Sequence, residues 1–235
     1  MAQTDTKPAN SRKSRPQRAD TKMRILDAAQ DLFNERGVNA VTTNHIAAEL
    51  GISPGNLYYH YRNKEDIIWH LFQRVEIEVD PILNVEKGEI IDAERMASDI
   101  TRVMQVMMDF RFLFSDIVGL VNRDPRMEEE FRALQERTVE RIAGTFHQSY
   151  AAGPIVADTP QVIVEALARN MWILIINWIS FVQSSKTDPG APITKLDLAH
   201  GVFHIFTMMR PYMSKESIAD LEAMFDFSAI EPPRR

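Results

Sequence analysis

The feature that most constrains the fold of this chain is the spacing of small and apolar residues in the segment TTNHIAAELGISPGNLYYHY. Ala47 lies four residues before Gly51, and Leu57 follows six residues after that glycine. Two short helices that cross steeply need a small residue at their closest approach, and the turn between them needs a residue that tolerates positive φ. Thr42 and Ser53 can each cap a helix start. The segment therefore predicts two short helices joined by a tight turn.

Helices are also expected on both sides of this pair. Apolar residues recur at helical spacing over 21–36, and Gly37 ends that stretch. A further helix is expected to begin at Asn63, whose side chain can cap it. These helices define a compact domain over residues 20–66. Residues 1–19 are rich in Lys, Arg, Ser and Pro, so we expect a disordered basic arm there.

The pattern of the remaining residues, 67–235, also predicts helices. The sequence has only nine glycines, and no stretch alternates apolar and polar residues long enough to indicate a sheet. Asp124, Thr159 and Thr194 stand where helix caps are expected. The predicted fold is all-α, with an N-terminal three-helix unit followed by a larger helical domain. The expected helices of that domain are 93–110, 112–122, 125–152, 160–184, 195–209 and 215–226.

Charge is unevenly distributed along the chain. The net charge is −6, but residues 1–64 carry ten Lys or Arg against six Asp or Glu, which is +4, and the remainder carries −10. A basic end on an acidic body suits a protein that touches a polyanion with one end. The alternative is that residues 1–24, which alone contribute +5, make that end basic without such a role.

Several other classes of protein are not indicated. The absence of cysteine fits a reducing cytoplasm, and the polar N-terminus does not resemble a signal peptide. The apolar stretch from Met171 to Val182 is shorter than the roughly 20 residues that span a bilayer, so no membrane partner is expected. No nucleophile or phosphate-loop motif is present, and His200 and His204 have metal-ligand spacing without an accompanying Glu. We therefore expect neither an enzyme nor a cofactor or metal site.

The N-terminal segment resembles the TetR family of transcriptional regulators. The family pattern T-x3-IA, then G-[IV]-S-x-G-x-LY-x-H-[FY]-x-x-K, is matched from Thr42 to Lys64, with Tyr61 where Phe is more usual. The resemblance covers residues 21 to about 72. It implies a helix-turn-helix that binds double-stranded DNA and a helical C-terminal domain that dimerises and holds a small molecule.

The resemblance also implies roles for individual residues of the helix-turn-helix. Residues expected to hold phosphates are Thr43, Tyr59, His60 and Lys64, and those expected nearest base edges are Asn44, Pro54, Gly55 and Asn56, with Ser53 at the start of the second helix. Three alternatives remain open. Thr43 extends a helix cap, Tyr58 is a packed spacer rather than a DNA contact, or Lys64 is an ordinary solvated charge.

Two candidate surfaces stand out in the C-terminal domain. The helix at 160–184 is apolar on almost every face, which predicts burial all round and a partner subunit. Methionines suit sites that accept flexible apolar ligands, although Met at helical spacing is also common in cores. The stripe expected at the dimer interface is Met171, Leu174, Ile175, Trp178 and Val182. The residues expected to line a ligand pocket are Met104, Met107, Met108, Phe114, Asn170, Ile173 and Asn177. The two faces of the helix could also be exchanged.

The function that these observations favour is a cytoplasmic, homodimeric regulator that binds a near-palindromic operator. A mostly apolar effector, such as a fatty acid or an acyl-CoA-like molecule, would release it, as expected of a repressor. The alternatives are a DNA-binding protein controlled only by its abundance, an activator of a lipid or storage-polymer operon, and an all-α enzyme with a DNA-binding domain. The last lacks a visible catalytic cluster.

Overall fold

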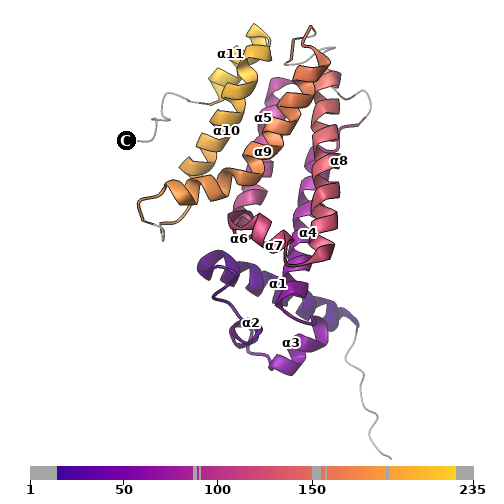
Figure 1. Cartoon of the computed structure of the whole chain (residues 1–235), viewed down its shortest axis with the longest axis vertical. Coiled ribbons are helices and arrows are strands. Elements are labelled where there is room, and N and C mark those ends of the chain that lie inside the picture. The colour runs from indigo at the N-terminus through magenta and orange to yellow at the C-terminus, as the bar shows by residue number, and fades with distance from the viewer. Residues whose placement is uncertain are drawn as a thin grey trace, which may run out of the picture. The chain divides into compact units, whose positions relative to one another are not determined.

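The computed structural model describes residues 15–86, 89, 91–149, 155–156, 158–188 and 191–225. Within these residues the regular elements are helices, apart from an isolated antiparallel bridge between Ile155 and Met213, so the all-α prediction is confirmed (Figure 1). The elements are α1 (Arg15–Arg36), α2 (Thr43–Glu49), α3 (Pro54–His60), α4 (Lys64–Leu83), α5 (Ala93–Asp109), α6 (Arg111–Ser115), α7 (Ile117–Val121), α8 (Pro125–Ser149), α9 (Gln161–Ser185), α10 (Lys195–Met209), the 3-10 turn η1 (Arg210–Tyr212) and α11 (Lys215–Met224).

The chain forms two compact units, Met1–Ile67 and Ile68–Arg235, called here the N-terminal and C-terminal units. The first contains α1, α2, α3 and the start of α4. The second contains the rest of α4 and all later helices. Helix α4 is therefore one continuous element that begins in the N-terminal unit and ends in the C-terminal one.

Helix α1 is longer than expected. It begins at Arg15, within the arm of residues 1–19 that we expected to be disordered, instead of at about Thr21. Pro16 occupies the first turn, where its missing N–H is not needed, so the proline is compatible with an earlier start. Residues 1–14 of the predicted arm lie outside the described residues. The predicted end is confirmed, since Gly37 follows the helix with φ of 77°.

In the C-terminal unit, α9 is the central helix. It packs against α5, α6, α8 and α10, while α11 packs on α5 (Figure 1). Four other helices therefore cover much of the surface of α9, which explains why most of its circumference is apolar. By length and composition α9 could also cross a membrane, a test that the core helix of a soluble protein passes as well.

Two predicted boundaries in this unit were wrong. The helix expected over 112–122 is divided at Asp116, whose carboxylate accepts a hydrogen bond from the Gly119 backbone N–H at 3.2 Å and so starts α7. Thr159 does not cap α9; its hydroxyl donates to the Val156 carbonyl at 2.7 Å, and Pro160 takes the cap position without a side-chain bond. By contrast, Thr194 and Asp197 form the expected reciprocal cap of α10.

Candidate DNA-binding surface and ligand cavity

The two short helices of the N-terminal unit both begin at the predicted caps. The Thr42 hydroxyl accepts from the His45 backbone N–H at 3.3 Å, and the Ser53 hydroxyl accepts from the Asn56 N–H at 3.2 Å. His45 returns the first bond, because its Nδ1 accepts from the Thr42 N–H at 3.3 Å. A histidine thus takes the place that Glu or Gln usually fills in a capping box.

The turn between α2 and α3 has the predicted geometry. Gly51 has φ of 65°, a conformation that costs other residues free energy. Ala47 is fully buried, and its carbonyl accepts from the Ile52 N–H at 3.0 Å. A small buried residue on α2 and a glycine in the turn therefore allow the two helices to pack against each other.

A small core fixes the pair in place. Ile46, Leu57 and Tyr61 are buried, while Leu50 and Ile52 are only half-buried. The Tyr61 hydroxyl donates to the Lys22 carbonyl at 3.1 Å, so a tyrosine here gains a bond to α1 that phenylalanine would lack. This is a physical reason for the departure from the family pattern.

The residues expected to face DNA lie mostly at the surface. Ser53, Pro54, Gly55, Asn44 and Asn56 are exposed. The side chains of Asn44 and Asn56 hydrogen-bond to none of the described residues, which leaves both amides available to a ligand. An amide pairs well with the N6 and N7 edge of adenine.

The aromatic residues of α3 differ in their surroundings. Tyr59 is 63% exposed and meets the half-buried His60 ring edge-on, with 5.3 Å between ring centroids. Tyr58 is 51% exposed, and its hydroxyl lies 2.9 Å from the Thr43 hydroxyl of α2. The Tyr58 hydroxyl therefore links α3 to α2. Thr43, which follows the cap residue Thr42, hydrogen-bonds to Tyr58 through its own hydroxyl.

Lys64 has a contact that sequence reasoning missed. Its Nζ donates to the carbonyls of Val38 at 2.9 Å and Val41 at 3.1 Å, in the segment that joins α1 to α2. The ammonium group therefore holds this connection in place and is not an ordinary solvated charge. One of its three N–H bonds is left for another acceptor.

On α9 the stripe that we expected at the dimer interface is the buried one. Met171, Ile175, Trp178 and Val182, expected at the dimer interface, are buried within the unit, and Leu174 is half-buried. Trp178 Nε1 donates to the Asp197 carbonyl of α10 at 2.9 Å. The stripe expected to face the pocket is instead exposed: Asn170, Ile173 and Asn177.

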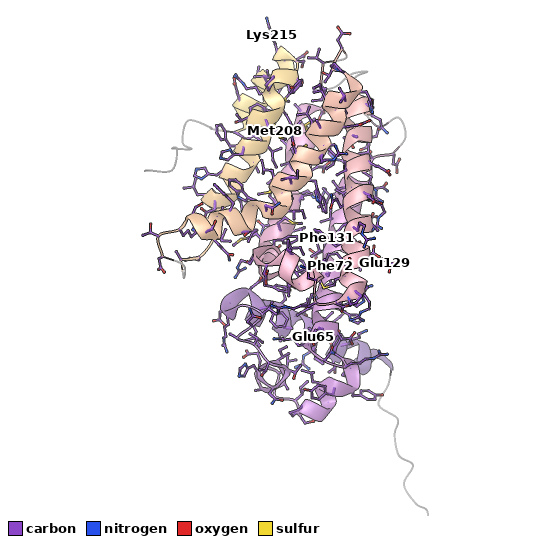
Figure 2. The ribbon with its side chains drawn as sticks, viewed as in Figure 1. Glu65, Phe72, Glu129, Phe131, Met208 and Lys215 are labelled. Carbon is purple, nitrogen blue, oxygen red and sulfur yellow. The ribbon has the colours of Figure 1, made fainter. Side chains whose placement is uncertain are left out.

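A cavity does lie in the C-terminal unit, bounded by α4, α5, α6, α8 and α9. The cavity has a volume of about 100 Å³. Phe72 and Phe131 (Figure 2) line it, with 6.4 Å between their ring centroids. They belong to a row of rings that continues to Trp69 at one end and Trp172 at the other, with centroids 6.1 and 5.8 Å apart. The rest of the lining is mostly aliphatic, with two further phenylalanines and four polar residues.

Of the expected pocket residues, Met107 and Phe114 line this cavity, as do Met171 and Ile175 from the stripe assigned to the interface. Met104 is buried but packs against Gly201 of α10, where a Cβ would also lie 2.8 Å from Trp178 Nε1. Met108 is outside the lining. The cavity wall supplied by α4 was missed, although Phe72, Val75, Val79 and Ile82 recur at helical spacing and were visible in the sequence.

The polar lining residues are two acids and two threonines. Asp99 is well paired, with Oδ2 2.7 Å from Arg95 Nε and Oδ1 3.5 Å from Arg102 Nη1. The Thr145 hydroxyl donates to the Arg141 carbonyl at 3.0 Å. Thr138 is buried, and its hydroxyl hydrogen-bonds to none of the described residues. No Lys, Arg or His is among the described lining residues.

Glu76 is the fourth polar residue of this lining. Arg137 Nη2 donates to Glu76 Oε1 at 2.9 Å and to Glu130 Oε1 at the same distance, so two carboxylates share one guanidinium. Burial, together with the negative charge of Glu130, raises the pKa of Glu76 to about 7 despite Arg137. Glu76 is therefore a carboxyl group with an incomplete counter-charge at the wall of an apolar cavity.

Metal binding finds no support among the described residues, where no group of three or more His, Asp or Glu side chains could hold an ion. His200 and His204 lie on α10, and His204 packs against Trp178 with 5.3 Å between ring centroids. His200 Nε2 is buried without a hydrogen-bond partner.

Two family profiles match the chain over almost its whole folded length. The profile described as bacterial regulatory proteins of the tetR family covers residues 25–71, and the profile TetR, described as a bacterial transcriptional repressor, covers residues 74–221. The chain belongs to the TetR family of transcriptional regulators. Regulators of this family are DNA-binding transcription factors rather than enzymes, and in general they are soluble cytoplasmic proteins.

Individual relatives agree. A TetR-family regulator from Marinobacter aquaeolei VT8 is 34% identical, with a TM-score of 0.77 over 86% of this chain and 98% of that one. A putative regulator from Saccharomonospora viridis, crystallised in complex with choline, is 21% identical, with a TM-score of 0.64 over 84% of this chain and 100% of that one. An HTH-type transcriptional regulator of Staphylococcus aureus (strain MRSA252) is 30% identical over 99 residues, 42% of this chain and 54% of its own length. The chain thus spans about half the length of the curated relatives it matches.

Proposed function

We propose that this protein is a homodimeric repressor that binds a near-palindromic operator and is released by a small lipophilic effector. The observation that carries the proposal is the geometry of the helix pair α2 and α3. Its caps, glycine turn and core fix α3, while the exposed amides of Asn44 and Asn56 have no partner among the described residues. A rigid short helix with a free amide face is suited to reading base edges in the major groove.

Thr43, Tyr59, His60 and Lys64 are the proposed phosphate contacts, and Pro54 and Gly55 let the backbone approach closely. Tyr59 is exposed enough to reach a phosphate, and Thr43 and Lys64 keep hydrogen-bonding capacity beyond their internal bonds. Phosphate contacts set affinity and register, whereas Asn44 and Asn56 would set base preference.

A second copy of the chain would cover the exposed apolar residues of α9 and α10. Val162, Ile173 and Phe181 on α9 and Leu196 on α10 are each more than half exposed. Regulators of this family bind DNA as dimers. Large apolar side chains gathered on two packed helices favour these helices as the interface. Two α3 helices would then enter successive major grooves, about 34–36 Å apart.

The cavity favours an effector-responsive regulator over one controlled by abundance alone. Its lining suits an elongated lipophile, which agrees with the apolar part of the fatty-acid or acyl-CoA expectation. The head group of those molecules fits less well, because a carboxylate or phosphate would face Glu76 and Asp99 with no Lys, Arg or His among the described lining residues.

The proposal is tested by selecting bound sequences from a random DNA library and footprinting them. We expect two inverted half-sites about one helical turn apart. Asn56→Ala should change the preferred bases by about 1–3 kcal/mol per affected base pair, while Tyr59→Phe should weaken binding evenly across sequences. Selection of no common sequence, or of a single half-site, would contradict it.

A further inference from the structure

The charge of the cavity lining bears on the kind of molecule that enters it. We infer that the cavity binds a lipophile with a positively charged head group and that Glu76 is the counter-charge. This inference rests on the proposed role of the cavity as the effector site. An amine or quaternary ammonium with an apolar body is the class of ligand meant.

The apolar part of the argument is the wall itself. Aliphatic and aromatic side chains from five helices line the cavity, among them Val79, Met107, Phe114 and Ile176. Such a wall offers dispersion contacts and burial to a hydrocarbon but few hydrogen bonds. Sugars and nucleotides would leave most of their hydroxyl and phosphate groups without partners there.

The sign of the head group follows from which charged groups reach the lining. Glu76 and Asp99 line the cavity, whereas Arg95 and Arg137, which pair with them, do not. A ligand therefore meets the carboxylates first. An anionic head group would lose its water beside negative charge, which is unfavourable. A cationic head group would lose its water beside opposite charge, and the attraction offsets part of that cost.

Glu76, and not Asp99, has room for a further cation. Asp99 already receives bonds from two arginines. Glu76 shares the guanidinium of Arg137 with Glu130, and burial further penalises its charged form. A ligand cation would supply the counter-charge that Arg137 divides between two acids, and would favour the ionised form of Glu76.

The experiment uses the full-length protein without DNA and three probes that share one chain length: octyltrimethylammonium, octanol and octanoate. Isothermal titration at pH 8 should give a dissociation constant about ten-fold lower for the cation than for octanol, and weaker binding for octanoate. Glu76→Gln should bring the cation to the level of octanol while octanol itself is unchanged. Glu78→Gln, an exposed neighbour on α4 outside the lining, is the matched control and should keep the preference.

A second measurement needs no variant. At pH 6.5 a carboxyl group with a pKa of about 7 is about three-quarters protonated, so the cation should displace up to about three-quarters of a proton from wild-type protein. Titration in buffers of different ionisation enthalpy detects this release. The charged groups that contact Glu76 are Arg137 and Glu130 of α8. Equal or tighter binding of octanoate, a cation preference that survives Glu76→Gln, or no binding of any probe would overturn the inference. A cation that binds as described but leaves operator binding unchanged would instead contradict the proposed effector role.

Discussion

Lys64 shows how one side chain can serve both the fold and a ligand. Its ammonium group bonds to the Val38 and Val41 carbonyls, a contact across 26 and 23 residues that no local sequence pattern indicates. The family pattern pointed to the position but not to this use. The role of Lys64 at a phosphate stays a prediction. Its structural role and its role in DNA binding can be tested by separate measurements.

Lys64→Ala should lower the free energy of unfolding of the N-terminal unit by about 1–3 kcal/mol, because two carbonyls lose a charged donor. Urea unfolding followed by far-UV circular dichroism measures this loss. If the remaining N–H holds a phosphate, the salt dependence of operator binding should also fall by about one ion. Lys215→Ala, which removes the same charge from an exposed site on α11, should change neither quantity. An unchanged unfolding curve for Lys64→Ala would refute the structural role.

Gly51 offers a test of backbone conformation with no interference from packing. A Cβ added there meets nothing within 4 Å, so only its φ of 65° opposes a side chain. Gly51→Ala should destabilise by about 1–2 kcal/mol, and Gly51→Asn by less, because asparagine tolerates this region better. Gly144, inside the C-terminal part of α8, also has open space around it but lacks positive φ. Gly144→Ala should therefore stabilise, by up to about 1 kcal/mol, and thermal unfolding would show the opposite signs.

At the scale of elements, the residue at which a helix starts could be predicted from the sequence, but the face that a helix turns toward the core could not. The starts of α2, α3, α4 and α10 follow from a capping residue and its neighbours three positions on, so their sequence contains the whole interaction. Helix α9 is different. The amides of Asn170 and Asn177 beside Ile173 fit either an outward face or the polar anchors of a pocket, and the neighbours of α9 come from distant parts of the chain. The sequence of α9 alone therefore did not decide which stripe faces inward.

The exposed stripe of α9 gives a prediction about assembly. Phe181→Glu or Ile173→Glu should place a charge in the proposed dimer interface and yield folded monomers that bind operator weakly, since one half-site offers half the contacts. Sedimentation velocity and circular dichroism measure the two parts. Ile77→Glu is the control, because Ile77 is 71% exposed on α4 and lies outside that stripe. If both α9 variants remained dimeric, the interface would have to lie elsewhere.

At the scale of the whole molecule, Glu76 links stability to pH. In the unfolded chain it titrates near 4.5, and in the folded protein its pKa is about 7. Between these values the folded state keeps a proton that the unfolded state has lost, so the contribution of Glu76 to stability falls as pH rises from 4.5 to 7. The total loss is at most about 3 kcal/mol, and solvent that screens this half-buried group makes it smaller; it levels off above pH 7.

Glu76→Gln mimics the protonated side chain and should remove this dependence. The variant should therefore be more stable than wild type at pH 8, by up to about 3 kcal/mol, and equal to it near pH 4. Chemical denaturation at both pH values measures the difference, and comparison at equal pH cancels the other titrating groups. A variant less stable than wild type at pH 8 would show that the pairing of Glu76 with Arg137 outweighs the cost of burial.

The row of rings from Trp69 through Phe72 and Phe131 to Trp172 also has an optical consequence. All three tryptophans, at positions 69, 172 and 178, belong to the C-terminal unit, whereas three of the five tyrosines stand at positions 58, 59 and 61 of α3 and its end. Trp172 lines the cavity itself. Selective excitation of tryptophan therefore reports on the C-terminal unit and not on α3, so a guest molecule that alters the surroundings of Trp172 gives a signal without any added dye.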